Sequence, residues 1–225
     1  MKKKNISIVI IIIMCVFFEI MYHMNSYSEG ADIYMPSFGV SLLENDEIIA
    51  YRLGNDVLHG EINFDGLEIG KDIKKNIAVK NYGGAGQFVR IIITRYWFDK
   101  NGKKSDNIDP NFIELKLTGD ENWLVPKEQK TPERMIAYYK KAIEYDEKTS
   151  NFIDSVKISP DIYDYGYTIS EDDNGNIAVD YNISGFNMII EVDAVQTHNA
   201  KVAIKSAWGI DVEISEDEST ILEIY

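Results

Sequence analysis

Residues 79–98 read VKNYGGAGQFVRIIITRYWF, and they decide the fold class of this chain. From Phe88 onward, apolar and polar residues alternate with a period of two, which is the pattern of a half-buried β-strand. β-Branched and aromatic residues, which favour strands, dominate the stretch. One side carries Val89, Ile91, Ile93 and Trp97, and the other carries Arg90, Thr94 and Tyr96. This pattern predicts a β-sandwich.

Three glycines interrupt the pattern just before this strand. Gly83, Gly84 and Gly86 can adopt positive φ, so we expect residues 77–80 to reverse and pair nearby. A glycine-rich loop that binds phosphate precedes a helix, whereas these glycines lie between two strand patterns. The break therefore indicates a connection between strands and not a phosphate site.

The remaining chain repeats short strand patterns separated by turn signals. Asn45-Asp46 is one such turn, and residues 99–102 form another after the long strand. Residues 200–208 follow the period of an amphipathic helix, which Gly209 ends. Residues 221–225 are expected to close the sheet. The sequence thus predicts an all-β, antiparallel sandwich with one short helix near the C-terminus.

Residues 163–183 predict the strongest β-hairpin of the chain. Tyr163, Tyr165 and Tyr167 alternate along its first strand, and Asn174-Gly175 supplies the left-handed residues of a type I′ turn. The tyrosine stripe has two interpretations. It is either a face that binds glycans or a protein partner, or a sheet face packed with amphipathic rings. The first makes these three tyrosines candidate binding residues.

Residues 1–28 predict a signal peptide. A basic cluster at residues 2–4 precedes an apolar run over residues 6–18, which Glu19 ends. A run of this length fits the central region of a leader, whereas a helix that spans a bilayer needs roughly 20 apolar residues. We therefore expect the protein to be secreted, either into an extracellular matrix or onto the cell surface.

Small residues mark the expected cleavage point. Ser26 and Ser28 occupy the two positions that a signal peptidase reads, so we expect this enzyme as a partner and cleavage after Ser28. Cleavage after Gly30 is the second choice. Retention of the leader as an anchor is a further alternative, because residues 20–21 extend its apolar character.

The mature chain must be stable without disulfides, because the single cysteine, Cys15, lies in the leader. At about 197 residues (225 minus 28) it can bury about 70% of its unfolded surface. We expect one β-sandwich domain over residues 37–225. Residues 29–36 are too poor in apolar residues for a core strand, and they form a separate extended segment.

The charge balance argues against nucleic acid and anionic lipid as partners. The chain has 23 basic and 37 acidic residues, a formal net charge of −14. Removal of the leader takes away three lysines and one glutamate, so the charge becomes −16. Such a surface repels phosphate groups and favours solubility. The membrane is then a partner only through the leader, before cleavage.

Motifs predict no catalytic residue, no metal site and no cofactor, so we expect a protein that is not an enzyme. Outside the leader the histidines are His59 and His198, and no HExxH or G-x-S-x-G motif occurs. The acidic turn 172–176 resembles a calcium loop. Ile177 and Ile183, however, occupy the places of its invariant glycine and its bidentate glutamate. Weak calcium binding stays open, as does a metal-dependent hydrolase built on paired carboxylates.

Three stretches together resemble the TasA/camelysin family of exported Gram-positive biofilm matrix proteins. They are the leader followed by Ala31-Asp32, residues 79–102 with their Asn-x-Gly and F-V-R-I sequences, and DAVQTHNAKVAIKSAWG at residues 193–209. The resemblance implies a jelly-roll-like β-sandwich, secretion, and processing by a dedicated signal peptidase. It departs from the family at residues 163–183, which look like an added hairpin.

In the matrix-forming members of that family, an extended N-terminal segment adds a strand to the next subunit. Carried onto this chain, the donor is residues 29–36, with Ile33 and Met35 as its inward side chains. We therefore expect a structural subunit that self-associates or joins other matrix proteins. The alternative is a surface module that binds a glycan or a protein through the tyrosine-rich hairpin.

Overall fold

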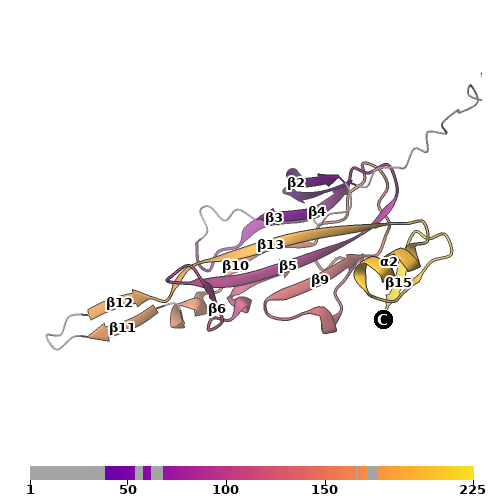
Figure 1. The fold of residues 1–225 in the computed structure, drawn as a ribbon. Helices are drawn as coiled ribbons and strands as arrows, with labels where there is room; N and C mark the ends of the chain where they lie inside the picture. Colours follow the sequence, from indigo (N-terminus) through magenta and orange to yellow (C-terminus); the bar gives the residue numbers. More distant parts are fainter. Residues whose placement is uncertain (1–38, 54–57, 62–67, 166, 172–176) are drawn as a thin grey trace, which may run out of the picture. The chain divides into compact units, whose positions relative to one another are not determined.

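Antiparallel β-strands form most of the described chain, and α2 (Ala200–Trp208) is its one α-helix (Figure 1). The computed structural model describes residues 39–53, 58–61, 68–165, 167–171 and 177–225. The expected signal peptide at 1–28 lies outside these described residues. So does the expected donor segment at 29–36, with Ile33 and Met35.

The first of two larger sheets has five strands. Their order is β2-β1-β4-β10-β7, with bounds Glu47–Leu53, Gly39–Glu44, Ile73–Asn81, Ile153–Ile158 and Ile113–Leu117. The turn between β1 and β2 is the predicted one, because Asn45 and Asp46 both have positive φ (52° and 68°). That geometry is the type I′ turn, which matches the twist of a hairpin.

The second larger sheet is organised around the long strand predicted from the sequence, β5 (Gln87–Asp99). Its order is β3-β13-β5-β9-β8, with the remaining bounds Leu58–Glu61, Ile183–Gln196, Arg134–Tyr139 and Trp123–Leu124; β6 (Lys104–Ser105) also pairs with β5. β5 and β13 pair along almost their whole lengths, from Ile183 opposite Asp99 to Gln196 opposite Gln87.

The two sheets enclose one hydrophobic core. Leu42, Val79 and Ile153 contribute from the first sheet, and Ile91 and Ile190 from the second. The side of β5 predicted to face a core is confirmed, since all four of its predicted residues are buried in this cluster. The prediction of an all-β, antiparallel sandwich with one short helix near the C-terminus is therefore confirmed.

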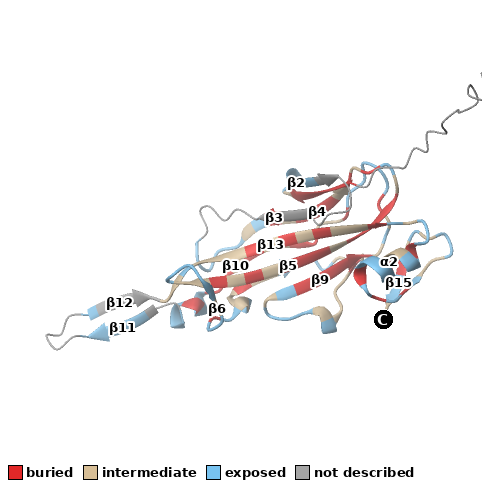
Figure 2. Ribbon diagram, in the orientation of Figure 1, coloured by how far each residue is buried: buried red, intermediate tan, exposed pale blue. Residues whose placement is uncertain are grey.

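A second cluster covers part of the outer face of the second sheet. Phe88, Ile92 and Tyr138 pack there against α2 and against a small hairpin, β14 (Val212–Ile214) with β15 (Ile221–Ile224). The prediction that residues 221–225 close the sheet is wrong, because among the described strands β15 pairs with β14 and belongs to neither larger sheet. The helix has the predicted bounds, and Gly209 ends it in the left-handed conformation (φ 74°). Figure 2 shows the resulting run of buried residues along β5, β9 and β13.

The glycine-rich connection carries the chain from one sheet to the other, so residues 77–80 in β4 pair within the first sheet and not with β5. The buried side chain of Asn81 holds this connection. Its Nδ2 donates to the carbonyls of Ala85 and Ile143, both at 2.8 Å, and its Oδ1 accepts from the N–H of Gly83 at 2.7 Å. Gln87 Nε2 donates to the same Oδ1 at 2.7 Å. A side-chain network thus holds the connection between the two sheets.

Candidate binding site at the base of the hairpin

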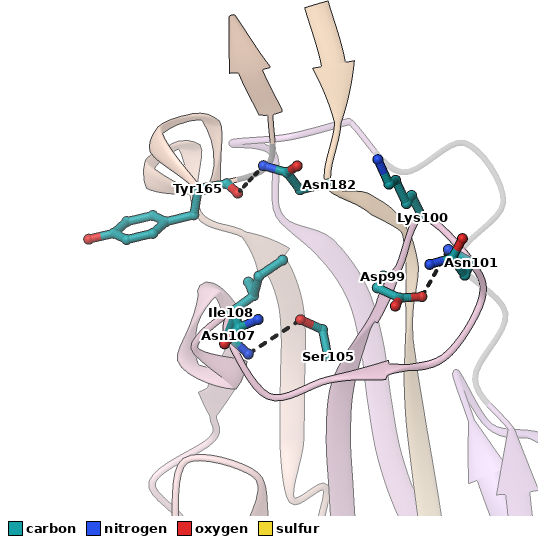
Figure 3. A pocket seen from close by; sticks show the side chains of 8 residues that line it. All are labelled: Asp99, Lys100, Asn101, Ser105, Asn107, Ile108, Tyr165 and Asn182. Carbon is teal, nitrogen blue, oxygen red and sulfur yellow. Dashed lines mark hydrogen bonds between the residues drawn. The ribbon is translucent and has the colours of Figure 1, made fainter.

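A cavity of about 290 Å³ lies beside the turn that follows β5. Its lining comes from that turn, from the segment after β6, and from the base of a separate hairpin formed by β11 (Tyr167–Glu171) and β12 (Ile177–Tyr181). The lining residues are Asp99, Lys100, Asn101, Ser105, Asn107, Ile108, Tyr165 and Asn182 (Figure 3). The site therefore lies where the two large sheets give way to the hairpin.

The first wall is the turn predicted at residues 99–102. Gly102 takes the positive φ of 75° that closes it, and its N–H donates to the carbonyl of Asp99 at 2.9 Å. The Asp99 carboxylate accepts from the backbone N–H of Lys103 at 2.8 Å and of Asn101 at 2.9 Å. These hydrogen bonds, that of Lys103 foremost, lower the pKa of Asp99 below its ordinary value. The cavity is thus lined by a carboxylate that stays ionised.

Asn182 forms the second wall, between β12 and β13. Its Nδ2 donates to Thr168 Oγ1 at 3.1 Å and to the carbonyl of Tyr165 at 3.5 Å. Ser184, at the start of β13, donates its hydroxyl to the carbonyl of Asp99 at 2.6 Å. These contacts tie the base of the hairpin to the β5–β6 turn.

The prediction that Tyr163, Tyr165 and Tyr167 alternate along one strand is wrong. Tyr163 lies in η3 (Pro160–Asp164) and Tyr165 follows it, so neither belongs to a strand; β11 begins only at Tyr167. The physical reason is the Ser159-Pro160 pair. Ser159 caps the 3₁₀ turn by accepting from the N–H of Asp161, and proline is suited to the first helical position. This local signal is visible in the sequence.

Tyr163 and Tyr165 are also not packed as a sheet face, because they are 53% and 55% exposed. The ring of Tyr165 lies 5.2 Å from that of Phe112, and Figure 3 shows it pointing away from the other lining residues. The structure therefore brings one of the three predicted tyrosines to the cavity and leaves Tyr163 apart. For Tyr167, the structure describes only the backbone, which pairs with Tyr181.

The lining favours hydrogen bonding over catalysis. It offers one carboxylate, an ammonium group, three amides, a hydroxyl and the apolar edge of buried Ile108. Within the described ranges, no group of three or more His, Cys, Asp or Glu residues is placed to hold a metal ion. His198 is exposed beside Asn199, and the acidic turn 172–176 lies outside the described residues. The lining thus combines hydrogen-bonding groups with one charge of each sign.

A second hollow, of about 350 Å³, lies against β1 and β2 and is dominated by ion pairs. Lys80 Nζ lies 2.6 Å from Asp146 Oδ1, and Lys148 Nζ lies 2.5 Å from Asp46 Oδ1. The hydrogen bond to Asp146 raises the pKa of Lys80. Because these charges already satisfy one another, we regard this hollow as a weaker candidate for ligand binding.

None of the helices in the part of the chain that the structure describes has the length and apolar character needed to cross a membrane. Comparison of the chain with protein-family models, with curated proteins and with solved structures finds no match.

Proposed function

We propose that the protein is a secreted structural subunit of an extracellular matrix, and that it forms fibres by adding its N-terminal segment to a sheet of the next copy. The observation that carries this proposal is the open edge of the first sheet. β2 is seven residues long and lies at the end of that sheet, pairing among the described strands only with β1. Such an edge is a template for an incoming strand.

The edge at β2 is also unprotected by charge at its centre. Ile48, Ile49 and Tyr51 are exposed along it, whereas proteins that resist strand addition place lysine or proline there. The other end of the sheet, β7, is less accessible. There the guanidinium of buried Arg95 donates to the carbonyl of Ile113. We therefore assign the acceptor to β2, with Ile33 and Met35 of the incoming segment turned toward the core.

The strand order supports the jelly-roll-like topology that the resemblance implies. Leaving the β1–β2 hairpin aside, the order β3-β13-β5-β9 faces β4-β10-β7 across the core. If β6, which pairs with β5, is set aside, strands β3, β4, β5 and β7 alternate between the two sheets, as successive strands of a jelly roll do. A signal peptide over residues 1–28 remains part of the proposal, since fibre growth outside the cell requires export.

The test compares chains that begin at residue 29 and at residue 37, imaged by electron microscopy over a range of concentrations. We expect fibres only from the longer chain. Ile48→Pro in the longer chain tests the acceptor. Ile48 is the second residue after the type I′ turn, so its N–H points away from β1 and proline removes a donor that an added strand would use. Fibres from the shorter chain, or undiminished fibres from the proline variant, would overturn the assignment.

A second candidate function is binding of a glycan at the cavity beside Asn182. It is favoured by the hydrogen-bonding groups that line this cavity of about 290 Å³. Titration of isotope-labelled protein with soluble oligosaccharides would show shifts at Asn101 and Asn182, which Asn182→Ala should remove. Shifts spread evenly over the surface would count against a site.

A further inference from the structure

The β11–β12 hairpin has no other sheet to join within the described chain. Its two strands pair only with each other, from Tyr167 opposite Tyr181 to Glu171 opposite Ile177. A two-stranded hairpin alone in water is marginally stable, and it normally gains order by packing one face against something else. The composition of its two faces shows which face that would be.

One face of the hairpin is apolar. Alternate positions share a face, so positions 167, 169 and 171 lie with their partners 181, 179 and 177. These six positions hold two tyrosines, two isoleucines, a valine and a glutamate, whereas the opposite face holds Thr168, Ser170, Ala178 and Asp180. Ile169 is 60% exposed and Ile177 is 70% exposed. The apolar face is therefore uncovered where the structure describes it.

The charges at the two ends of the hairpin favour a second copy of the chain as the partner of this face. The tip of the hairpin carries three acids in a row, residues 171–173, and no base. Its base lies beside the β5–β6 turn, because Ile183 pairs with Asp99. That turn carries Lys100 and Lys103 after Asp99, and Lys104 of β6, which follows, is paired with Glu133. The acidic tip disfavours an anionic membrane or a nucleic acid. A second hairpin of the same kind, running in the opposite direction, would place each acidic tip against a basic turn.

We propose that the chain forms a two-fold dimer in which the apolar faces of two β11–β12 hairpins stack in antiparallel orientation. Such a contact is self-complementary, as a two-fold interface requires. It buries Ile169 and Ile177 of both copies, and it pairs Glu171 with the lysine-rich turn of the partner. The dimer holds whether or not the N-terminal segment builds fibres, so it goes beyond the proposed function.

Sedimentation velocity on the full chain over a concentration series tests the dimer. The double variant Ile169→Thr with Ile177→Thr should raise the dissociation constant by about 100-fold, because four isoleucine side chains lose their apolar contact. The matched control, Thr168→Ala with Ser170→Ala on the opposite face, should leave it unchanged. A wild-type protein that is monomeric at every concentration would overturn the proposal, as would an isoleucine variant that dimerises like the wild type.

A charge exchange tests the antiparallel orientation. Glu171→Lys and Lys103→Glu each place like charges together and should weaken the dimer by about 10-fold, and the combined variant should restore it. Added salt should weaken the wild type and strengthen the single variants. Failure of the combined variant to recover would overturn the stacking geometry. Fibres, followed separately by electron microscopy, should be unaffected by these changes at the hairpin.

Discussion

The described residues contain two two-stranded ribbons apart from the larger sheets, and the two ribbons differ in what covers them. In the β14–β15 ribbon, Val212 and Ile221 are buried against α2 and the outer face of the second sheet. In the β11–β12 ribbon, Ile169 and Ile177 are exposed. Both have an apolar face, so the difference lies in the partner and not in the ribbon. An apolar strand face in this protein thus indicates a contact, which is internal in one case and, by our proposal, external in the other.

Breaking the internal contact should have the largest effect. Trp208 lies 5.5 Å from the ring of Tyr138 and 5.3 Å from the guanidinium of Arg90, and it joins α2 to the second sheet. Trp208→Ala should lower the free energy of unfolding by about 3–5 kcal/mol, because it opens a cavity in the second cluster. Denaturant titration measures this change. Val202→Ala, on the exposed side of the same helix, should change it by less than about 0.5 kcal/mol.

The comparison between covered and uncovered regions extends to two asparagine side chains, the buried Asn81 and the partly exposed Asn182. Asn81→Ala removes the side-chain acceptor of Gln87 Nε2 and the side-chain donor to the Ala85 carbonyl. The Gly83 N–H keeps the Gly39 carbonyl and the Ile143 carbonyl keeps the Gln87 N–H, so each of these two groups loses one of two partners. The substitution should cost about 2–4 kcal/mol of unfolding free energy. Asn182→Ala, at the exposed base of the hairpin, should cost less than about 1 kcal/mol. Equal losses at the two sites would contradict the idea that burial decides the cost.

The β11–β12 ribbon should tolerate isoleucine-to-threonine substitutions better than the β14–β15 ribbon does. At concentrations below dimer formation, Ile169→Thr with Ile177→Thr should change the free energy of unfolding by under about 0.5 kcal/mol, because these side chains already contact solvent. Ile221→Thr, in the covered ribbon, serves as the matched comparison and should cost several times more. A large loss in the hairpin variant of the monomer would show that its isoleucines pack within the chain.

The smallest effect is expected at the turn beside the hairpin. The pKa of Asp99 is lowered in the fold, so its ionised form contributes stability above the ordinary aspartate pKa of about 3.9. That contribution is lost as the pH falls through the lowered pKa. Carboxyl NMR should show Asp99 titrating below the ordinary value, and Asp99→Asn should make unfolding less sensitive to acid. Titration of Asp99 at or above that value would contradict the hydrogen bonding at this turn.

Local patterns in the sequence predicted the elements better than their partners. The alternation along β5, the helix ended by Gly209 and the turn at Asn45-Asp46 each depend on neighbouring residues, and each is confirmed. The crossing from β4 to β5 and the separate pairing of β15 were missed, because strand partners are chosen by contacts between residues far apart in sequence.

The residues that line the candidate cavity were likewise predicted only in part. Asp99 and Asn101 belong to a turn that the sequence predicted, but nothing local marked Asn182 as their neighbour. The β5–β13 register brings the two together, and a register between strands so distant in the chain has no local signature. The tyrosines were misplaced for a different reason, since Tyr163 and Tyr165 alternate in sequence but follow a Ser159-Pro160 pair that starts a 3₁₀ turn.

The hydrogen bonds at the start of β1 bear on how the protein would respond to a pulling force. The carbonyl of Gly39 accepts from the N–H groups of Tyr82 and Gly83, at 2.9 and 3.1 Å, at the point where the described chain begins. β1, which starts there, lies between β2 and β4 and is hydrogen-bonded to both. A pull along β1 through the N-terminal segment would strain the ladders on both sides of the strand at once, in shear, instead of opening them one bond after another. In a polymer joined through that segment, tension would therefore enter each subunit at the strand best placed to resist it.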